Sequence, residues 1–402
     1  MKRFVIIGGG AAGFFAAINA AEMHPNLEVI ILEGSNKVLQ KVKVSGGGRC
    51  NVTHACFTPN ELVEFYPRGK KELRGSFHQF MTGDTMEWFE NRGVSLKIED
   101  DNRVFPQSNS SQTIIDCFLE SAKNAGVILK TSTRVDAIKK IGEKFIIKTT
   151  SEEFTANYVL VASGSNTKVW NMMEELGHTI IKPVPSLFTF NIEDERLKEI
   201  PGISVPKATV TILNSKLTEH GPLLITHWGL SGPAILKLSA WGALELSQKK
   251  YQFQIEVNWL SLKFEAVLER LKSAKKNHAK KQVVLHTVFE EIPKRLWHKL
   301  ILAAVISENE QWAQLSNKQL DNLTNQLTKS AFNVTGKSTF KDEFVTAGGI
   351  NLKEIDFKRF ESKLHKNLFF AGEVLNIDAV TGGFNFQNAW TGAWIVANSV
   401  NN

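Results

Sequence analysis

Residues 4–13 read Phe4-Val5-Ile6-Ile7-Gly8-Gly9-Gly10-Ala11-Ala12-Gly13. The apolar run at the start is typical of a strand buried on both faces, as the first strand of a parallel sheet must be. In the glycine run, Gly8 permits a tight turn, Gly10 lets the backbone approach a pyrophosphate, and Gly13 allows close helix packing. The helix that begins there directs its N-terminal N–H groups at the phosphates. The pattern predicts a dinucleotide-binding βαβ unit.

Residues 14–33 complete this unit. Four alanines of the expected helix form a face of small side chains that packs on a sheet: Ala16, Ala17, Ala20 and Ala21. A second apolar strand at Val29–Leu32 ends in Glu33, which lies 33 − 13 = 20 positions after Gly13. The fold places a carboxylate there to accept hydrogen bonds from a ribose 2′-OH. Because an acid disfavours a 2′-phosphate, FAD and NAD remain as the candidate dinucleotides.

A second glycine cluster covers Ser45–Asn51 and has no long buried strand before it. Its exposed backbone amides, beside the guanidinium of Arg49, suit a phosphate or the edge of a flavin ring. We interpret the cluster as a loop that approaches a ligand closely. A simple glycine-rich turn is the alternative.

The C-terminal region favours FAD over NAD. Leu368–Glu373 is typical of a buried strand that ends in glycine and an acid, and Thr381-Gly382-Gly383 then leads into an alanine-bearing helix. In FAD enzymes of this architecture the Gly-acid pair binds the ribityl chain. The following helix N-terminus points at the N1–C2=O edge of the flavin, where it stabilises the negative charge of the reduced ring.

Several long motifs together resemble the BaiN-like bacterial flavoproteins, a family of NAD(P)/FAD-dependent oxidoreductases that includes proteins called aminoacetone oxidases. The motifs cover residues 46–53, 226–233, 346–350, 370–375 and 381–385, so the resemblance spans nearly the whole chain. It implies FAD as the cofactor. The residues expected to contact FAD are Gly8, Gly10, Ala11, Ala12, Gly13, Glu33, Lys41, Gly47, Gly48, Arg49, Cys50, Asn51, Val135, Ser163, Gly164, Gly372, Glu373, Gly383, Phe384 and Asn385.

The order of the motifs predicts a discontinuous domain. Tyr158–Gly164 reads as the returning strand of the same sheet, whereas the prolines of Pro183–Ser186 read as a rigid break before a region of short strands and then helices. We therefore predict an α/β fold in which a Rossmann-like FAD-binding domain with a parallel sheet, residues 1–186 and 341–402, is interrupted by a β-barrel-like plus helical insert, residues 187–340.

Composition narrows the class of protein. The chain has 402 residues, of which 43% are hydrophobic and 22% charged, as in ordinary globular proteins. Its net charge of +7 is a weak sign of an acidic partner, because basic and acidic residues are mixed. Cys50, Cys56 and Cys117 have neither disulfide-framework nor zinc-site spacing, so we expect a reducing compartment and no metal. The N-terminal apolar run is too short for a signal sequence or a membrane span, which favours the cytoplasm.

Few side chains are candidates for the chemistry. Flavin N5 accepts or gives a hydride, so the protein must bind the ring and position a second reactant. No second nucleotide fingerprint is present, so NAD(P)H, if used, docks transiently as a co-substrate. Arg49 is a candidate for an anionic ring or substrate, or for a structural salt bridge, and His227 for proton transfer, or for a structural hydrogen bond. Cys50 is a packed side chain rather than a redox group, and Glu373 a ribityl ligand rather than a base.

The leading functional prediction is an FAD-dependent oxidoreductase acting on a small molecule. It reduces an activated double bond with NAD(P)H or oxidises an amine with O₂. One alternative is an FAD-containing protein that binds or modifies nucleic acid, motivated by the net charge and the basic run Lys275–Lys281, which otherwise is a solvated helix end. The other is a redox sensor without turnover. We expect a small-molecule substrate and no nucleic-acid or membrane partner; the sequence leaves the substrate and the oligomeric state open.

Overall fold

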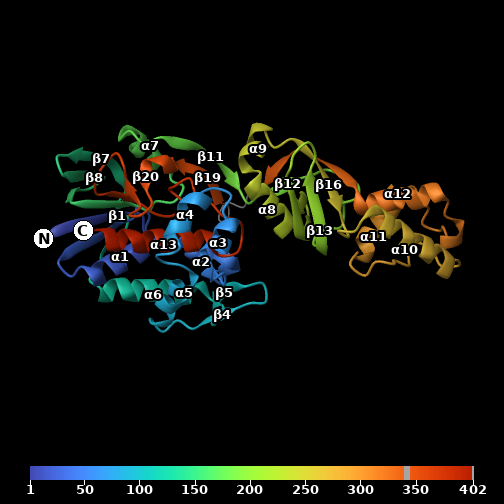
Figure 1. Cartoon of the computed structure of the whole chain (residues 1–402), viewed down its shortest axis with the longest axis horizontal. Helices are drawn as coiled ribbons and strands as arrows, with labels where there is room; N and C mark the ends of the chain where they lie inside the picture. Colours follow the sequence, from blue (N-terminus) through green and yellow to red (C-terminus); the bar gives the residue numbers. More distant parts are fainter. Residues whose placement is uncertain (339–344, 401–402) are drawn as a thin grey trace. The chain divides into compact units, whose positions relative to one another are not determined.

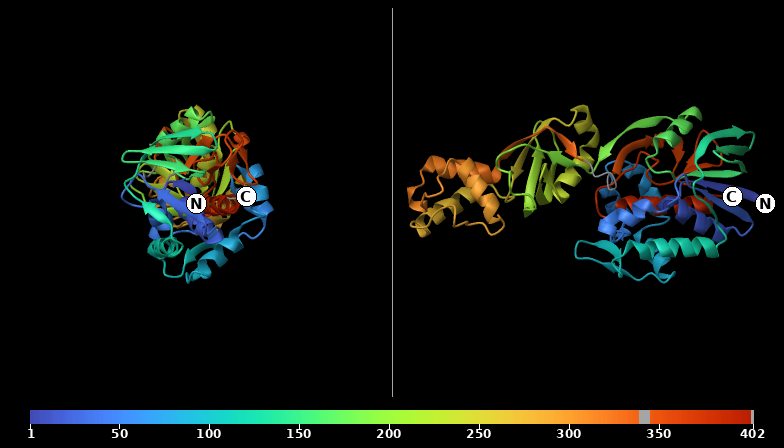
Figure 2. Two further views of the ribbon diagram at one scale, coloured as in Figure 1. Left: turned by 90° about the vertical axis from the view of Figure 1, so that its left-hand side faces the viewer. Right: turned by 180° about the vertical axis from the view of Figure 1, so that it is seen from behind.

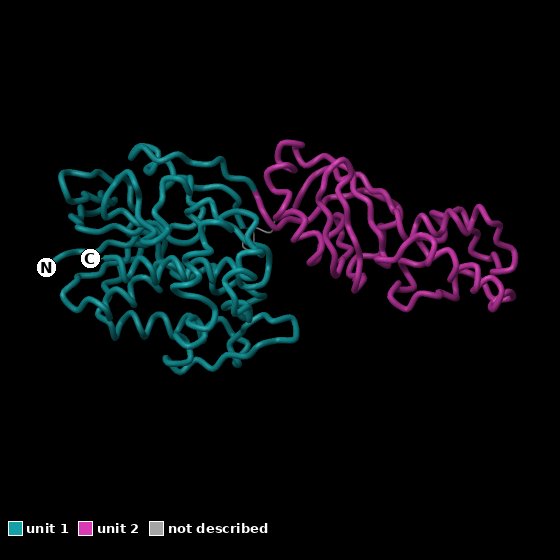
Figure 3. Tube along the Cα trace, in the orientation of Figure 1, with its two compact units in different colours: residues 1–184, 341–402 teal, residues 185–340 magenta. Residues whose placement is uncertain are grey.

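The structure is a computed structural model that describes residues 1–338 and 345–400. It has two compact units: unit 1 comprises residues 1–184 and 341–402, and unit 2 comprises residues 185–340 (Figure 3). The sequence placed these boundaries after residues 186 and 340. The glycine motifs near the two ends of the chain therefore belong to the same unit.

Unit 1 is built on a seven-stranded sheet, in which β1 is the middle one of the five parallel strands (Figure 1). Phe4 at its start pairs in parallel with Val29 on one side and Tyr158 on the other. Because both faces of β1 are covered, its apolar residues are almost completely buried. The predicted parallel sheet with a returning strand is confirmed. The strands in order are β20 (Ile355–Asp356), β21 (Glu361–Ser362), β22 (Leu368–Phe370), β10 (Tyr158–Val161), β1 (Lys2–Ile7), β2 (Leu27–Leu32) and β6 (Ile128–Lys130).

Helices cover one face of this sheet and a β-meander the other. α1 (Ala11–Met23) and α13 (Phe384–Ser399) pack side by side, although they come from opposite ends of the chain (Figures 1 and 2). β7 (Val135–Ile141), β8 (Lys144–Thr149) and β9 (Glu153–Ala156) form an antiparallel sheet that contacts β1 and β10 from the side away from α1.

An aromatic cluster joins α1 and α13 to the helices between β2 and β6. The Phe15 ring centroid lies 4.5 Å from that of Trp88 and 5.3 Å from that of Trp390, and Phe118 lies 5.5 Å from Trp390. Buried aromatic pairs contribute specific packing beyond their area. The elements between β2 and β6 are α2 (Gln40–Gly48), β3 (Thr53–His54), α3 (Pro59–Leu62), η1 (Val63–Phe65), α4 (Lys70–Ser76), α5 (Thr82–Glu90), β4 (Leu96–Ile98), β5 (Arg103–Pro106) and α6 (Ser111–Asn124).

The proline-rich segment lies at the boundary between the two units and forms a strand. Pro183 and Pro185 lie inside β11 (Ile180–Ser186), which pairs with β19 (Val345–Ile350) in a two-stranded sheet. Proline removes one backbone donor, and a strand with a single partner tolerates this loss at positions that face away from the partner. The change from one unit to the other therefore occurs after Val184, within a continuous strand.

A buried histidine ties three segments of unit 1 together. His178 follows α7 (Thr167–Glu175); its Nδ1 lies 2.9 Å from Oε2 of Glu354, and its Nε2 lies 3.0 Å from Oγ of Ser362. The Ser362 hydroxyl oxygen also accepts from two backbone amides. Because the serine is buried and its oxygen is occupied, this trio is a structural link and not a nucleophile.

This link makes the stability of unit 1 pH-dependent. Burial lowers the pKa of His178, so below about pH 6.5 the unfolded chain binds the proton more readily and stability falls. Burial raises the pKa of Glu354, but hydrogen bonds from Thr179 and His178 outweigh this and lower it, so its contribution is lost only below about pH 4.5. We expect the melting temperature of unit 1 to fall between about pH 6.5 and 5, and a His178→Gln variant to be less stable but flatter over that range. Equal slopes for the two proteins would contradict this account.

Unit 2 contains an antiparallel seven-stranded sheet that curls into a barrel-like shape. Its two edge strands, β17 and β18, are separated only by Thr335, so one nearly continuous segment pairs with β16 and then with β12. This joins the two edges of the sheet. The strands in order are β17 (Ser330–Val334), β16 (Phe253–Asn258), β13 (Ser204–Ile212), β14 (Thr218–Thr226), β15 (Gly229–Ser231), β12 (Thr189–Asn191) and β18 (Gly336–Ser338).

One hydrophobic core runs through unit 2 from the sheet to its helices. Trp259 follows β16, and Trp297 and Trp312 lie among the helices; all three are fully buried in the same cluster. The core makes the helical part an extension of the barrel and not a separate domain. The helices are α8 (Pro233–Trp241), α9 (Ala243–Gln248), α10 (Phe264–Asn277), α11 (Lys294–Ala303), η2 (Trp312–Gln314) and α12 (Asn317–Thr328).

Candidate functional site

The three glycines after β1 differ in what surrounds them. A Cβ on Gly8 would lie 2.5 Å from the carbonyl oxygen of Ala162, and one on Gly13 would lie 2.0 Å from the carbonyl oxygen of Gly8. A Cβ on Gly10 would meet nothing within 4 Å. Gly8 and Gly13 are therefore required by the packing of β1, α1 and β10, whereas Gly10 borders open space at the N-terminus of α1.

The first turn of α1 and the end of β2 form one surface around that space. Ala11 and Ala12 begin α1, and no side chain caps the helix. The Glu33 carboxylate accepts from the backbone N–H of Gly9 at 2.8 Å and from that of Ser35 at 2.8 Å. A carboxylate has about four acceptor positions, so oxygens held in this way can still accept from ribose hydroxyls. The arrangement fits a pyrophosphate at the helix and a ribose at Glu33.

The second glycine cluster ends α2 in a left-handed turn. Gly46, Gly47 and Gly48 have φ angles of +58°, +68° and +82°. A Cβ on Gly46 would lie 2.9 Å from the backbone nitrogen of Asn51, but one on Gly47 or Gly48 would meet nothing within 4 Å. Arg49 is right-handed, with φ −97° and ψ −18°, between left-handed Gly48 and Cys50, and such an alternation of hands forms an anion-binding concavity of backbone amides. This loop is thus open on one side and suited to a ligand.

The side chains after these glycines are mostly committed to the protein. Arg49 Nη1 lies 2.6 Å from Oε1 of Glu99, and the guanidinium carbon lies 3.9 Å from the ring centroid of Phe105. The structural salt bridge weighed in the sequence analysis is therefore formed. The Asn51 side-chain oxygen is buried and has no hydrogen-bond partner among the described residues.

The Cys50 thiol is buried completely, and this burial raises its pKa to about 12. A thiol in this state carries almost no thiolate at neutral pH and does not react readily. We expect iodoacetamide to leave Cys50 unmodified in the native holoenzyme and to label it only after denaturation, as read by peptide mass spectrometry. A Cys50→Ala variant with normal flavin reduction would agree, whereas rapid native labelling would restore the redox role.

Glu373 brings four distant segments together. Its carboxylate accepts from the backbone N–H of Thr346 at 3.0 Å and forms an ion pair with Lys41. A Cβ on Gly164 would lie 3.6 Å from Glu373 Oε2, and one on Gly372 would lie 3.4 Å from the Cβ of Ala12. Lys41, Gly164, Gly372 and Glu373 therefore lie close together near the N-terminus of α1, and Gly372 and Glu373 are the pair that the sequence analysis expects at the ribityl chain.

The N-terminus of α13 has no side-chain cap and rests against the segment after the second glycine cluster. Gly383 has a φ of +94°, and a Cβ there would lie 2.5 Å from the carbonyl oxygen of Thr53. The Phe384 ring is buried and stacks 4.2 Å from that of Phe65, and the Asn385 amide bonds the backbone of Ala379 in both directions. These two side chains stabilise the fold around the start of α13.

Ser163 and Val135 lie near the two ends of the site. Ser163 follows β10, and its hydroxyl is buried without a partner among the described residues. Val135 begins β7; just before it, the N–H of Thr133 donates to the carbonyl of Glu33 at 2.8 Å, and Arg134 packs on Gly34. The start of β7 is therefore beside the carboxylate expected to hold the ribose, where an adenine edge would lie.

A buried polar network joins the two glycine-rich halves and was not predicted. Gln387 Oε1 accepts from Thr53 Oγ1 at 2.6 Å and from Thr85 Oγ1 at 3.0 Å. One turn further along α13, Trp390 Nε1 donates to the carbonyl of Val52 at 2.9 Å. Thr53 and Gln387 are 334 positions apart. Both are buried polar residues, and nothing in the sequence pairs them.

The features of this site fit an FAD-type dinucleotide. Two buried polar atoms without partners, three glycines facing open space and two uncapped helix N-termini lie along one path from Glu33 to α13. Buried polar groups are nearly always hydrogen-bonded, so the orphaned oxygens of Asn51 and Ser163 are available to a ligand at this site. The path explains why the sequence needs two glycine motifs and a third at its C-terminal end.

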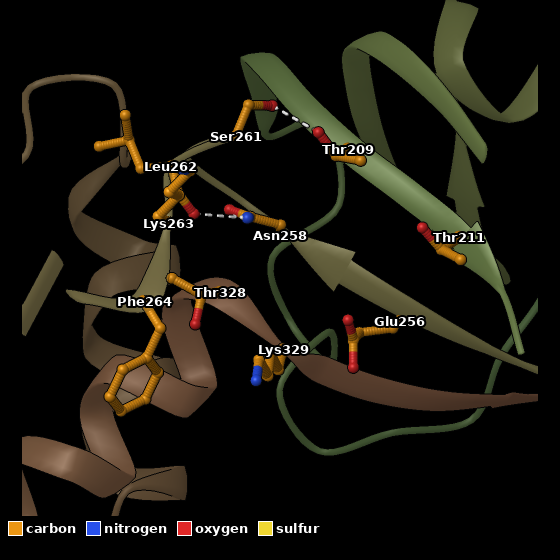
Figure 4. A pocket seen from close by; sticks show the side chains of 10 residues that line it. All are labelled: Thr209, Thr211, Glu256, Asn258, Ser261, Leu262, Lys263, Phe264, Thr328 and Lys329. Carbon is orange, nitrogen blue, oxygen red and sulfur yellow. Dashed lines mark hydrogen bonds between the residues drawn. The ribbon is translucent and has the colours of Figure 1, made fainter. Parts of the chain in front are cut away.

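Unit 2 contains the remaining candidate and a cavity of its own. His227 is exposed at the turn between β14 and β15, and its side chain forms no hydrogen bond with another residue in the described part of the chain. A cavity of about 330 Å³ lies at the junction of the sheet with α10 and α12 (Figure 4). It is lined mainly by hydroxyl and amide side chains with Lys263, Lys329 and Glu256, and it contains no predicted site residue.

Two classes of site are not found among residues 1–338 and 345–400. No group of three or more His, Cys, Asp or Glu side chains in these ranges is placed to hold a metal ion. No helix in the same ranges has the length and apolar character needed to cross a membrane.

Sequence comparisons match nearly the whole chain. A family model described as the HI0933-like protein Rossmann domain matches residues 2–399. The chain is 26% identical to a 3-dehydro-bile acid delta(4,6)-reductase of Clostridium scindens, with 98% of each chain covered. It is 27% identical to a ribosomal RNA dihydrouridine synthase of Haemophilus influenzae, again with 98% of each covered. An Escherichia coli protein of the same name is 26% identical, with 99% of this chain and 98% of that one covered.

A solved structure shares the fold at low sequence identity. The 3-ketosteroid-delta4-(5alpha)-dehydrogenase of Rhodococcus jostii superposes with a TM-score of 0.53 and 12% identity, covering 99% of this chain and 96% of that one. At this identity the likeness concerns the architecture alone. The Rossmann-type fold with a parallel sheet is confirmed by it.

Proposed function

This chain belongs to the family of HI0933-like Rossmann-domain proteins and is an FAD-dependent oxidoreductase, and we propose that it reduces a carbon–carbon double bond conjugated to a carbonyl group. When bound, FAD supplies the hydride from N5 of its reduced ring. The residues that would hold it are those along the path from Glu33 to the N-terminus of α13.

The observation that supports this reaction is the bond change shared by relatives with different substrates. A 3-dehydro-bile acid has a carbonyl at C3, so reduction of its Δ4 bond saturates a double bond conjugated to that carbonyl. Formation of dihydrouridine saturates the C5=C6 bond of uracil, which is conjugated to the C4 carbonyl. Both reactions deliver a hydride to the carbon β to a carbonyl. We propose this bond type, and not a particular molecule, as the substrate class.

The residues of unit 1 supply the electrostatic environment for this reaction. No side chain of a described residue caps α13, so the backbone N–H groups at its start would stabilise negative charge at the pyrimidine edge of the ring. The ion pair of Lys41 with Glu373 would hold the ribityl side. The charge of Arg49 is neutralised by Glu99. In this proposal Arg49 stabilises the glycine loop that precedes it and does not bind an anion directly.

Anaerobic stopped-flow measurement tests the proposal. We expect NADH or NADPH to bleach the flavin absorbance of the holoenzyme under argon, and a conjugated enone or uridine to restore it without O₂. NAD(P)H docks transiently, since the chain has only one dinucleotide fingerprint. If neither nicotinamide bleaches the flavin, the reductase fails, and hydrogen peroxide formation with small amines then tests the oxidase.

The second candidate substrate is RNA, in which the uracil ring contains the double bond that is reduced. Residues 261–329 contain twelve Lys and Arg against seven Asp and Glu, so this region holds +5 of the net charge of +7. On α10 and the turn after it, Lys272, Lys276, Lys280 and Lys281 are exposed and form no ion pair with a described residue. Their unpaired charge suits a phosphate backbone. Dihydrouridine formed in deproteinised ribosomal RNA, measured by mass spectrometry, would favour this candidate; turnover of free enones alone would exclude it.

A further inference from the structure

The loop that leads into α13 is fastened by a buried ion pair. Asp378 has no solvent exposure and the Arg68 side chain is 11% exposed. Arg68 Nε and Nη2 each donate to one carboxylate oxygen of Asp378, the parallel two-bond geometry that fixes orientation as well as distance. A backbone bridge joins the same two residues. Side chains and main chains thus hold residues 65–68 against residues 378–384 at one point.

Neighbouring contacts extend this attachment to the start of α13. The backbone N–H of Val380 donates to the carbonyl of Phe65 at 3.0 Å. The buried hydroxyl of Tyr66 donates to the carbonyl of Phe384 at 2.5 Å. The segment before α4 therefore contacts this loop in its middle and at the first residue of α13, so the position of that helix terminus depends on residues 65–68.

Stability alone does not account for a charged pair at this place. A well-packed apolar pair is often as stabilising as a buried ion pair, because burial of two charges costs most of what their attraction returns. The ion pair differs from an apolar pair in two respects: it fixes the relative orientation of the segments, and its charges cancel. Both properties matter beside a helix N-terminus that faces a redox-active ring.

We infer that Arg68 and Asp378 are positioning residues that hold the N-terminus of α13 at the pyrimidine edge of the flavin while adding no net charge of their own beside it. The inference rests on the proposed function, because it requires FAD in this site. The helix terminus then sets the local potential, and neither side chain contributes a net charge while the pair is intact.

Two single substitutions, Asp378→Asn and Arg68→Gln, distinguish the effect of the ion pair on the position of α13 from its effect on the charge beside the flavin. Each removes the ion pair that orients the loop before α13. Each is therefore expected to weaken FAD binding about tenfold or more in a fluorescence titration of the apoprotein. Asp378→Asn leaves a cation and is expected to raise the midpoint potential of the bound flavin, whereas Arg68→Gln leaves a carboxylate and is expected to lower it. Shifts in the same direction, or FAD affinities within twofold of the parent, would overturn the inference.

Two further proteins control for folding. Arg92→Gln removes a two-bond ion pair with Glu22 elsewhere in unit 1 and is expected to lower the melting temperature without changing FAD affinity or potential. The double variant Arg68→Met/Asp378→Leu is expected to regain the parent's melting temperature but to bind FAD weakly. If it regains both, the pair is only structural. If the parent protein itself does not bind FAD, the proposed function fails first, and that result is distinct from variants that bind as the parent does.

Discussion

A Gly10→Val variant is expected to fold as the parent protein does and to bind no measurable FAD. Gly10 has φ −94° and ψ −168°, an extended conformation open to any residue, and a Cβ there meets nothing within 4 Å. Because valine caps a helix less well than glycine, we expect the free energy of unfolding of the apoprotein to fall. The expected loss is no more than about 1 kcal/mol. Its isopropyl group would occupy the space at the helix N-terminus where the pyrophosphate is expected, weakening FAD binding by about 100-fold or more.

The measurement is a titration of apoprotein with FAD, followed by flavin fluorescence and accompanied by thermal unfolding. Gly10→Ala is the graded control: a single methyl group should reduce the affinity less than valine does. A purified Gly10→Val protein that retains a full complement of FAD would show that the pyrophosphate does not lie at this turn.

Gly13→Ala is expected to destabilise the fold of unit 1, because its new methyl group would clash with the protein's own backbone and not with the cofactor. The new Cβ would lie 2.0 Å from the carbonyl oxygen of Gly8 and 3.4 Å from the side chain of Ile6. That carbonyl cannot retreat easily, because the N–H of Gly8 donates to the carbonyl of Leu32 at 2.9 Å. Helix α1 must therefore move away from β1, and we expect unit 1 to lose about 2–4 kcal/mol of stability.

Hydrogen exchange of peptides from β1 and α1 measures this loss in unit 1 alone, which matters in a chain of two units. Gly83→Ala is a matched control, since Gly83 lies in α5 and its Cβ would meet nothing within 4 Å. It should leave stability unchanged or raise it by about 0.5–1 kcal/mol. Equal exchange in the Gly13→Ala variant and the parent would refute the packing argument.

The two glycines show how much the motif reveals by itself. Sequence identified both positions, because a β-branched run followed by G-x-G-x-x-G constrains the local backbone. It assigned different roles to them, and the surroundings of each Cβ agree: one glycine borders open space and the other touches backbone. The same local logic located the parallel strands and the helix after Gly383, whereas the left-handed conformation of Gly46, Gly47 and Gly48 comes from the structure.

The sequence motifs did not predict which side chains interact with one another. The sequence left Arg49 undecided between a ligand and a salt bridge, and only the packing of the β4–β5 hairpin against the glycine loop supplied Glu99. It named Phe384 and Asn385 as expected cofactor contacts, but it did not indicate that the Phe384 ring stacks on Phe65 or that the Asn385 amide bonds the backbone of Ala379. It gave no sign of the pair formed by Arg68 and Asp378, which are 310 positions apart.

The sequence by itself determined the βαβ unit, the cofactor class and the discontinuous course of the chain, because each depends on backbone requirements that a few neighbouring residues express. The tertiary structure alone decided that Pro183 and Pro185 lie in a strand, that β17 and β18 close the sheet of unit 2, and which buried polar groups hold the flavin end of the site together. These features depend on the meeting of segments hundreds of residues apart. Polar groups that are buried where these segments meet must form hydrogen bonds with one another, and neither hydropathy nor sequence spacing predicts which groups pair.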